Sequence, residues 1–179
     1  FGSEGGGVYA YSKDGKRRWN YNQGLREVFS APAWDGTNTI FFASTNQKVY
    51  ALAADSGALK WQYQTEDRIK GDPLFWNGFV FIGSYDRHLY AIDAQTGQPR
   101  WVFPPLPEAR DASASKKGKV ETAAVPAELQ VGEFSYSKPL IEKNMLYVGN
   151  LDGHLYALDA LSGQLRWRFR TGTGTEQAG

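Results

Sequence analysis

The sequence of 179 residues contains no cysteine, only two histidines and one methionine. The absence of cysteine excludes disulfide bonds and thiolate metal sites, although it does not fix the compartment. An excess of one charge sign is also lacking, because 20 basic and 19 acidic residues leave a formal net charge of +1. So weak a field favours neither nucleic acid nor an anionic membrane surface as a partner. We therefore expect no nucleic-acid partner.

Long apolar runs are missing as well. No run approaches the roughly 20 residues that a helix needs to cross a bilayer, so we expect no membrane span in this segment. The chain also lacks the basic start and the apolar stretch of a signal peptide. It begins with Phe1-Gly2-Ser3, which matches the end of a later apolar run, Phe81–Ser84. This match predicts that the sequence starts inside a strand and is part of a longer chain.

Aromatic and turn-forming residues are abundant. Aromatic side chains make up 15% of the sequence, and it contains 20 glycines and 8 prolines. Flat side chains pack well on a pleated sheet, while glycine and proline supply turns. This composition is typical of a β-rich protein with many short strands.

One pattern recurs four times along the chain. Each copy has a Tyr-Ala pair, then a turn and a tryptophan, and the repeat tyrosines Tyr9, Tyr50, Tyr90 and Tyr156 lie 41, 40 and 66 residues apart. A period near 40 residues is the size of one four-stranded propeller blade. The sequence therefore predicts an all-β fold, a β-propeller of four-stranded antiparallel blades. About three and a half blades are expected, as part of a seven- or eight-bladed ring.

The whole chain, residues 1–179, is predicted to be one partial propeller with an inserted loop. The long third interval holds about 26 extra residues, and the polar, proline-broken stretch 104–133 accounts for them. We expect this loop to join the outer strand of one blade to the inner strand of the next. The blade portions are predicted at 1–23, 28–65, 70–103 and 134–171.

Short apolar runs bounded by turn residues predict the strands inside each blade. Pro32, Pro73 and Pro139 precede them and mark the innermost first strands, where proline is tolerated at a strand end. Second strands are expected at 39–44, 79–84 and 145–150, a third strand at 88–93, and fourth strands at 100–103 and 166–169.

Several charged residues are expected to share one face of the propeller. Because strands alternate in direction, the inserted loop leaves from the same face as the turns between second and third strands. The loop itself carries a short basic cluster, Lys116, Lys117 and Lys119. The candidate binding face consists of Arg26, Glu66, Asp67, Arg68, Asp86, Arg87 and Asp152.

One segment fits a known eleven-residue pattern. Ala91, Asp93, Thr96, Gly97 and Trp101 have the spacing A-x-D-x-x-T-G-x-x-x-W. This segment resembles the tryptophan-docking motif of the pyrroloquinoline-quinone (PQQ)-like β-propeller repeats, which include BamB-like and quinoprotein-like repeats. The resemblance implies a structural role, in which each tryptophan stacks on the glycine-bearing turn of the neighbouring blade. The matching residues of the other copies are Ala51, Gly57, Trp61, Ala157, Asp159, Gly163 and Trp167.

Few residues suggest catalysis. Asp86 and Asp152 lie in turns at matching places of successive blades, where ordinary turn chemistry explains them. His88 and His154 begin equivalent strands on adjacent blades, a spacing that makes a shared metal ion unexpected. We therefore expect no catalytic residue, no metal site and no bound cofactor.

The resemblance leads to two functional hypotheses. The favoured one is a non-catalytic binding or scaffolding propeller, BamB-like or sensor-like, that contacts a partner through one loop face. The alternative is part of a quinoprotein alcohol or sugar dehydrogenase, and only under it are PQQ and Ca²⁺ expected. The expected partner is a protein or the remaining blades of a longer chain. A second copy that closes the ring is a further alternative. Family resemblance alone implies a periplasmic or extracellular location.

Overall fold

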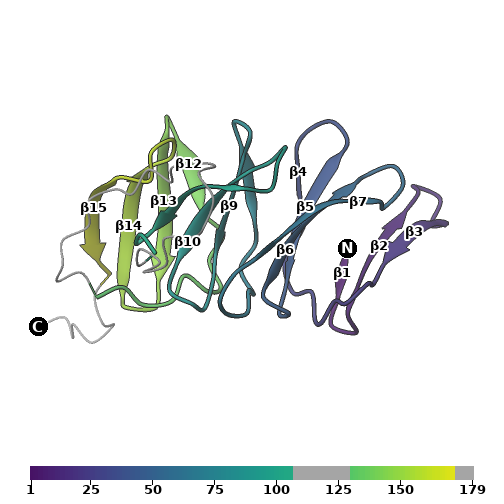
Figure 1. The fold of residues 1–179 in the computed structure, drawn as a ribbon, viewed down its shortest axis with the longest axis horizontal. Helices are drawn as coiled ribbons and strands as arrows, with labels where there is room; N and C mark the ends of the chain where they lie inside the picture. Colours follow the sequence, from purple (N-terminus) through teal and green to yellow (C-terminus); the bar gives the residue numbers. More distant parts are fainter. Residues whose placement is uncertain (107–129, 172–179) are drawn as a thin grey trace, which may run out of the picture.

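The computed structural model describes residues 1–106 and 130–171, and all of their regular structure is β-strand. Four antiparallel sheets stand side by side in chain order, from purple at one end to yellow-green at the other (Figure 1). The first sheet has three strands and each of the others has four. The predicted all-β propeller architecture is thus confirmed. The basic cluster Lys116 to Lys119 and most of the predicted insertion 104–133 lie outside the described residues.

Each sheet is a simple meander, in which every strand pairs with the next one along the chain. Among the described residues, no helix is long and apolar enough to cross a membrane. In chain order the strands are β1 (Gly2–Ser3), β2 (Gly7–Tyr11), β3 (Arg17–Tyr21), β4 (Ala33–Trp34), β5 (Thr39–Ser44), β6 (Lys48–Ala53), β7 (Leu59–Gln64), β8 (Leu74–Trp76), β9 (Phe79–Gly83), β10 (Leu89–Asp93), β11 (Pro99–Phe103), β12 (Leu140–Glu142), β13 (Met145–Asn150), β14 (His154–Asp159) and β15 (Leu165–Arg170).

The strands lie where the apolar runs predict them. The first strands β4, β8 and β12 begin directly after Pro32, Pro73 and Pro139, because proline cannot donate a ladder hydrogen bond from inside a strand. The third strand β6 is buried over nearly its whole length, whereas the fourth strand β7 is largely exposed. A strand buried on both faces packs between two neighbouring sheets, so the middle of each sheet forms the core.

The second-to-last strand of every sheet carries a local irregularity at the same place. Its register with the last strand shifts directly after Ala10, Ala51, Ala91 and Ala157, the alanines of the repeat. An irregularity of this kind bends the strand and increases its twist. Its recurrence shows that the four copies fold alike.

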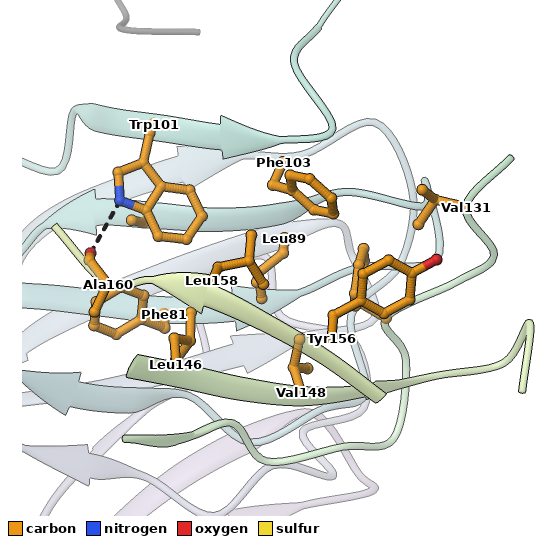
Figure 2. Close-up of a cluster of buried hydrophobic side chains, with 12 residues drawn as sticks. Phe81, Leu89, Trp101, Phe103, Val131, Leu146, Val148, Tyr156, Leu158 and Ala160 are labelled. Atoms are coloured by element: carbon orange, nitrogen blue, oxygen red, sulfur yellow. Dashed lines mark hydrogen bonds between the residues drawn. The ribbon is translucent and has the colours of Figure 1, made fainter. Parts of the chain in front are cut away.

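The hydrophobic core lies between neighbouring sheets. Figure 2 shows the cluster between the third and fourth sheets, where Trp101 and Phe103 of β11 face Leu146, Val148 and the repeat tyrosine of the next sheet. Two similar clusters join the other pairs of sheets. Burial between blades, at about 25 cal/mol per Å² of apolar surface, is therefore what holds the sheets side by side.

Candidate functional site

The repeat tryptophans join one sheet to the next. Trp101 is 2% exposed, and its indole N–H donates to the Ala160 carbonyl at 3.1 Å (Figure 2). A Cβ built on Gly163 would lie 2.6 Å from the Trp101 ring, so only glycine lets the ring approach this turn. The same arrangement joins Trp19 to Gly57 and Ala54, and Trp61 to Gly97 and Ala94.

The motif aspartates hold the turns that receive these rings. Asp93 Oδ1 accepts the backbone N–H groups of Gln95 and Thr96 and the Thr96 hydroxyl, at 2.9–3.0 Å. Burial acts to raise the pKa of Asp93, but these hydrogen bonds outweigh it and hold the pKa below its ordinary value. Asp159 binds its own turn in the same way and also accepts from Arg166. One oxygen of each carboxylate thus shapes the turn.

Trp167 is the exception among the motif tryptophans. It lies in β15 of the fourth sheet, is 44% exposed and packs beside Tyr147, with ring centres 5.9 Å apart. No glycine turn of the described residues covers it. Its role as a blade-joining residue therefore stays a prediction.

The opposite ends of the strands form what we call the loop face: the turns 44–48, 84–88 and 150–154 together with the segments that lead into each new sheet. Asp86 is its best-connected residue. Its Oδ1 accepts the His88 N–H at 2.9 Å, while Oδ2 accepts the Tyr90 hydroxyl at 2.8 Å and the Glu66 N–H at 3.0 Å. Asp86 therefore ties its own turn to the segment arriving from the second sheet.

The fourth sheet repeats this arrangement. Asp152 accepts the His154 N–H at 3.0 Å and the Tyr156 hydroxyl. Burial, followed by the bond to Asp152, raises the pKa of Tyr156 to about 12, so the phenol stays protonated. In the second sheet the side chain of Asn46 takes the same place and donates to the Tyr50 hydroxyl at 2.7 Å.

A cleft of about 760 Å³ opens on the loop face between the third and fourth sheets. It brings Asp86 and Arg87 of the predicted binding face together with Asp152, which is distant from them in sequence. It also contains both histidines and the carboxylate of Glu133. The charged and ionisable residues that line the cleft are Asp86, Arg87, His88, Glu133, Asp152 and His154.

The histidines each use one ring nitrogen locally. His88 Nδ1 lies 2.7 Å from the Pro104 carbonyl, and His154 Nδ1 lies 3.2 Å from the Asp152 carbonyl. Within residues 1–106 and 130–171, no group of three histidine or carboxylate side chains is placed to hold a metal ion.

Asp86 and Asp152 also fail to fit a calcium site. Ca²⁺ takes six to eight oxygen ligands. Both oxygens of each carboxylate already accept hydrogen bonds that shape the turn. Two carboxylates offer at most about four oxygens, so by themselves they do not complete the donor set that Ca²⁺ needs.

The remaining residues of the predicted binding face belong to the segments that lead into the second and third sheets. The Arg26 N–H donates to Ser44 Oγ at 3.2 Å. Asp67 Oδ1 accepts the Arg68 N–H at 2.7 Å. The backbone contacts of Arg26, Glu66 and Asp67 fix these segments, and Arg26, Glu66 and Arg68 are exposed.

Sequence reasoning missed a row of side chains beside Arg68. Phe29, Lys70, Tyr85 and Tyr136 lie next to one another and to Arg68, and we call these five side chains the aromatic–basic strip. A signal was available, because Phe29 and Lys70 each directly follow a buried aliphatic residue, Val28 or Ile69, in equivalent segments. Tyr136 lies beyond the insertion, where the repeat alignment gives no register.

Comparison with known proteins gives BamB proteins and quinone-type alcohol dehydrogenases among the relatives. The sequence family described as outer membrane protein assembly factor BamB matches residues 4–128 and 117–179. The dehydrogenase subunit of the quinone-type alcohol dehydrogenase of Acetobacter aceti is 33% identical over 150 residues, which cover 74% of this chain and 18% of that subunit. BamB of Burkholderia pseudomallei (strain K96243) is 28% identical over 193 residues, covering 91% of this chain and 50% of that protein.

Solved structures agree on the architecture. BamB of Moraxella catarrhalis matches with a TM-score of 0.68 and 19% identity, over 94% of this chain and 44% of that one. At this identity the match shows the fold alone. The chain spans half of the Burkholderia BamB and less than a fifth of the quinone-type alcohol dehydrogenase subunits. The resemblance to BamB-like and quinoprotein-like repeats inferred from the motif is confirmed.

Proposed function

The chain belongs to the BamB family of PQQ-like repeat propellers, and we propose that it is a non-catalytic scaffold that binds a protein partner through its loop face. The observation that carries this proposal is that the two ends of the strands hold different kinds of residues. At one end the motif residues are used in joining sheets. At the other, a cleft lined by charged residues lies on the same loop face as exposed aromatic and charged side chains. A rigid scaffold with functional loops is a common arrangement.

The partner proposed is a protein of outer-membrane protein assembly, as the description of the matching family suggests. Such a partner implies a location outside the cytoplasm. The exposed loop-face residues include Arg26, Glu66, Arg68 and Arg87. Arginine and tyrosine are enriched among residues that dominate protein interfaces, and the loop face holds both.

Site-specific photo-crosslinking tests this proposal. A photoreactive phenylalanine analogue replaces Glu66 or Arg87 on the loop face, or Gln98 at the opposite end as the control; all three side chains are exposed. We expect crosslinks to an outer-membrane assembly protein from positions 66 and 87 only. Equal crosslinking from position 98, or none from the loop face, would contradict the proposal.

A second candidate function is a portion of a quinone-dependent alcohol dehydrogenase. It is favoured by the 33% identity to the Acetobacter aceti subunit. The test is a titration of the intact protein with PQQ and Ca²⁺, followed by absorbance and by alcohol oxidation with an artificial electron acceptor. The scaffold proposal expects neither tight binding nor turnover, whereas both together would replace it with the dehydrogenase.

A further inference from the structure

The aromatic–basic strip crosses three successive blades. The Arg68 guanidinium lies 4.4 Å from the centre of the Tyr85 ring, and the Tyr85 and Tyr136 rings meet edge to face with centres 5.7 Å apart. The Lys70 ammonium lies 5.7 Å from the centre of the Tyr136 ring and 5.1 Å from that of Phe29. Each cation thus rests against an aromatic ring, and the five side chains follow one another without interruption.

The fold fixes the strip in place. Ile69 is buried, whereas its neighbour Arg68 is exposed and Lys70 is half-buried. The Tyr85 N–H donates to the Arg68 carbonyl at 3.1 Å, which anchors one end of the strip to the turn after β9. Gly71 lies close under Ser137, so the segment that carries Tyr136 packs directly on the one that carries Lys70. Little ordering is then needed when a ligand binds.

The strip is open to solvent. Phe29 is 46% exposed and Tyr136 is 64% exposed, while Arg68 is also exposed. Exposed aromatic rings of this size form an apolar surface, and a partner that covers this surface gains binding free energy. The hydroxyl of Tyr85 is buried and has no hydrogen-bond partner among the described residues.

In the part of the chain that the structure describes, neither Arg68 nor Lys70 forms an ion pair. Of the carboxylates nearby, Glu27 accepts the Thr45 hydroxyl, and Asp67 accepts the backbone N–H of Arg68. A guanidinium that stacks on a ring still offers its N–H fork to a carboxylate.

These features point to a ligand of one kind. We propose that the strip binds an acidic segment of the partner protein, an inference that rests on the scaffold function proposed above. Carboxylates of the segment pair with Arg68 and Lys70, and its apolar side chains cover Phe29 and Tyr136. Because the strip spans three blades and is open, an extended segment contacts all of it, whereas a small anion reaches one cation.

Peptide binding tests the proposal. The probe is a short capped peptide in which glutamate, phenylalanine and aspartate repeat in turn. In its neutral counterpart, glutamine and asparagine replace glutamate and aspartate. Binding to the intact protein is measured by calorimetry. We expect Arg68→Gln with Lys70→Gln to weaken acidic-peptide binding about tenfold or more, the size of effect typical of interface hot spots. Phe29→Ser with Tyr136→Ser is expected to weaken it several-fold.

The matched control is Lys13→Gln with Arg18→Gln, which removes the same charge from two exposed positions of the first sheet. We expect this pair to bind the peptide as the unaltered protein does. If both pairs of substitutions weakened peptide binding equally, net charge alone would explain the effect. If the neutral peptide bound as tightly as the acidic one, carboxylates would not be required. Either result overturns the proposal. Circular dichroism of each variant confirms that it is folded.

The two proposals fail separately. One outcome is crosslinking from positions 66 and 87 with acidic-peptide binding that does not depend on the strip. That outcome supports the scaffold function and contradicts the acidic-segment site. Peptide binding that depends on Arg68 and Lys70, without crosslinks to an assembly protein, supports the site and contradicts the assembly scaffold.

Discussion

Asp35 lies in the turn between β4 and β5 and accepts the backbone N–H groups of Thr37 and Thr39, at 2.8 and 3.0 Å. Burial acts to raise its pKa, but hydrogen bonds from Thr39 and Thr37 outweigh burial and lower the pKa from 3.8 to about 2. Asp93 and Asp159 have lowered pKa values for the same reasons. Turn carboxylates of this kind stabilise the fold only while they are ionised.

A loss of stability in acid follows. Because the folded pKa of Asp35 lies below its unfolded value, its contribution is complete above pH 3.8 and is lost as pH falls towards about 2. Thermal unfolding followed across this range should show a falling melting temperature. Asp35→Asn should flatten part of that fall, because asparagine does not titrate. An unchanged slope would contradict the assignment to Asp35.

Gly163 has a positive φ of 71° and lies against Trp101, whereas Gly153 has a φ of 79° and open space around it. Gly153→Ala should cost only the backbone strain of the left-handed region, about 1 kcal/mol. Gly163→Ala should cost clearly more, about 2–3 kcal/mol, because the new methyl group also overlaps the indole ring. Urea unfolding of the two variants separates the contributions, and equal costs would mean that the ring simply moves aside.

At the scale of elements, one hydrogen-bonding residue connects a strand, its turn and the segment from the preceding sheet. Asp86 binds the N–H groups of Glu66 and His88 and the hydroxyl of Tyr90. Burial is the main reason that the pKa of Tyr90 is raised, so the hydroxyl remains a donor at neutral pH. This part of the loop face is therefore hydrogen-bonded to the blade.

Replacing Asp86 should be more damaging than replacing its tyrosine partner. Asp86→Ala leaves three donors without their acceptor and should destabilise the protein by about 2–3 kcal/mol, whereas Tyr90→Phe removes one hydrogen bond and should cost about 1 kcal/mol. Chemical denaturation gives both values. Equal effects would show that the Glu66 and His88 contacts add nothing.

At the scale of the whole molecule, the sheets at the two ends differ from the inner ones. Trp101 is covered by the next sheet, but Trp167 of the last described sheet is half exposed. At the other end, the turn glycine Gly15 has a φ of 79° and no side chain against it. Blades of repeat proteins bury their faces on their neighbours, so we expect Trp167 to lie against a further blade in the intact protein. The number of blades in the ring stays a prediction.

Tryptophan substitutions measure whether that further blade exists. In the intact protein Trp167→Ala should destabilise by about 3–5 kcal/mol, as expected for Trp101→Ala, if both rings are covered. Trp34→Ala is the control, since Trp34 is 59% exposed and should cost under about 1 kcal/mol. A small effect for Trp167→Ala, measured by thermal unfolding, would show that its face stays open.

The sequence alone determined the repeat, the strands and the contacts between blades. Tyrosine, glycine and tryptophan recur at a fixed period, and the resemblance of this motif to a known repeat implied that Trp101 stacks on a glycine-bearing turn of the next blade. The alternation of strand direction also predicted which residues share the loop face, and their binding role stays a prediction.

Only the tertiary structure decided which loop-face residues meet. Asp86 and Asp152 are 66 residues apart in the sequence, yet they line one cleft together with His88 and His154. Lys70 lies between Phe29 and Tyr136, two residues from different blades. Such contacts depend on how one sheet is rotated against the next and on loops that the repeat does not specify. Local sequence patterns do not predict that geometry, because it arises only when the buried faces of the blades pack together.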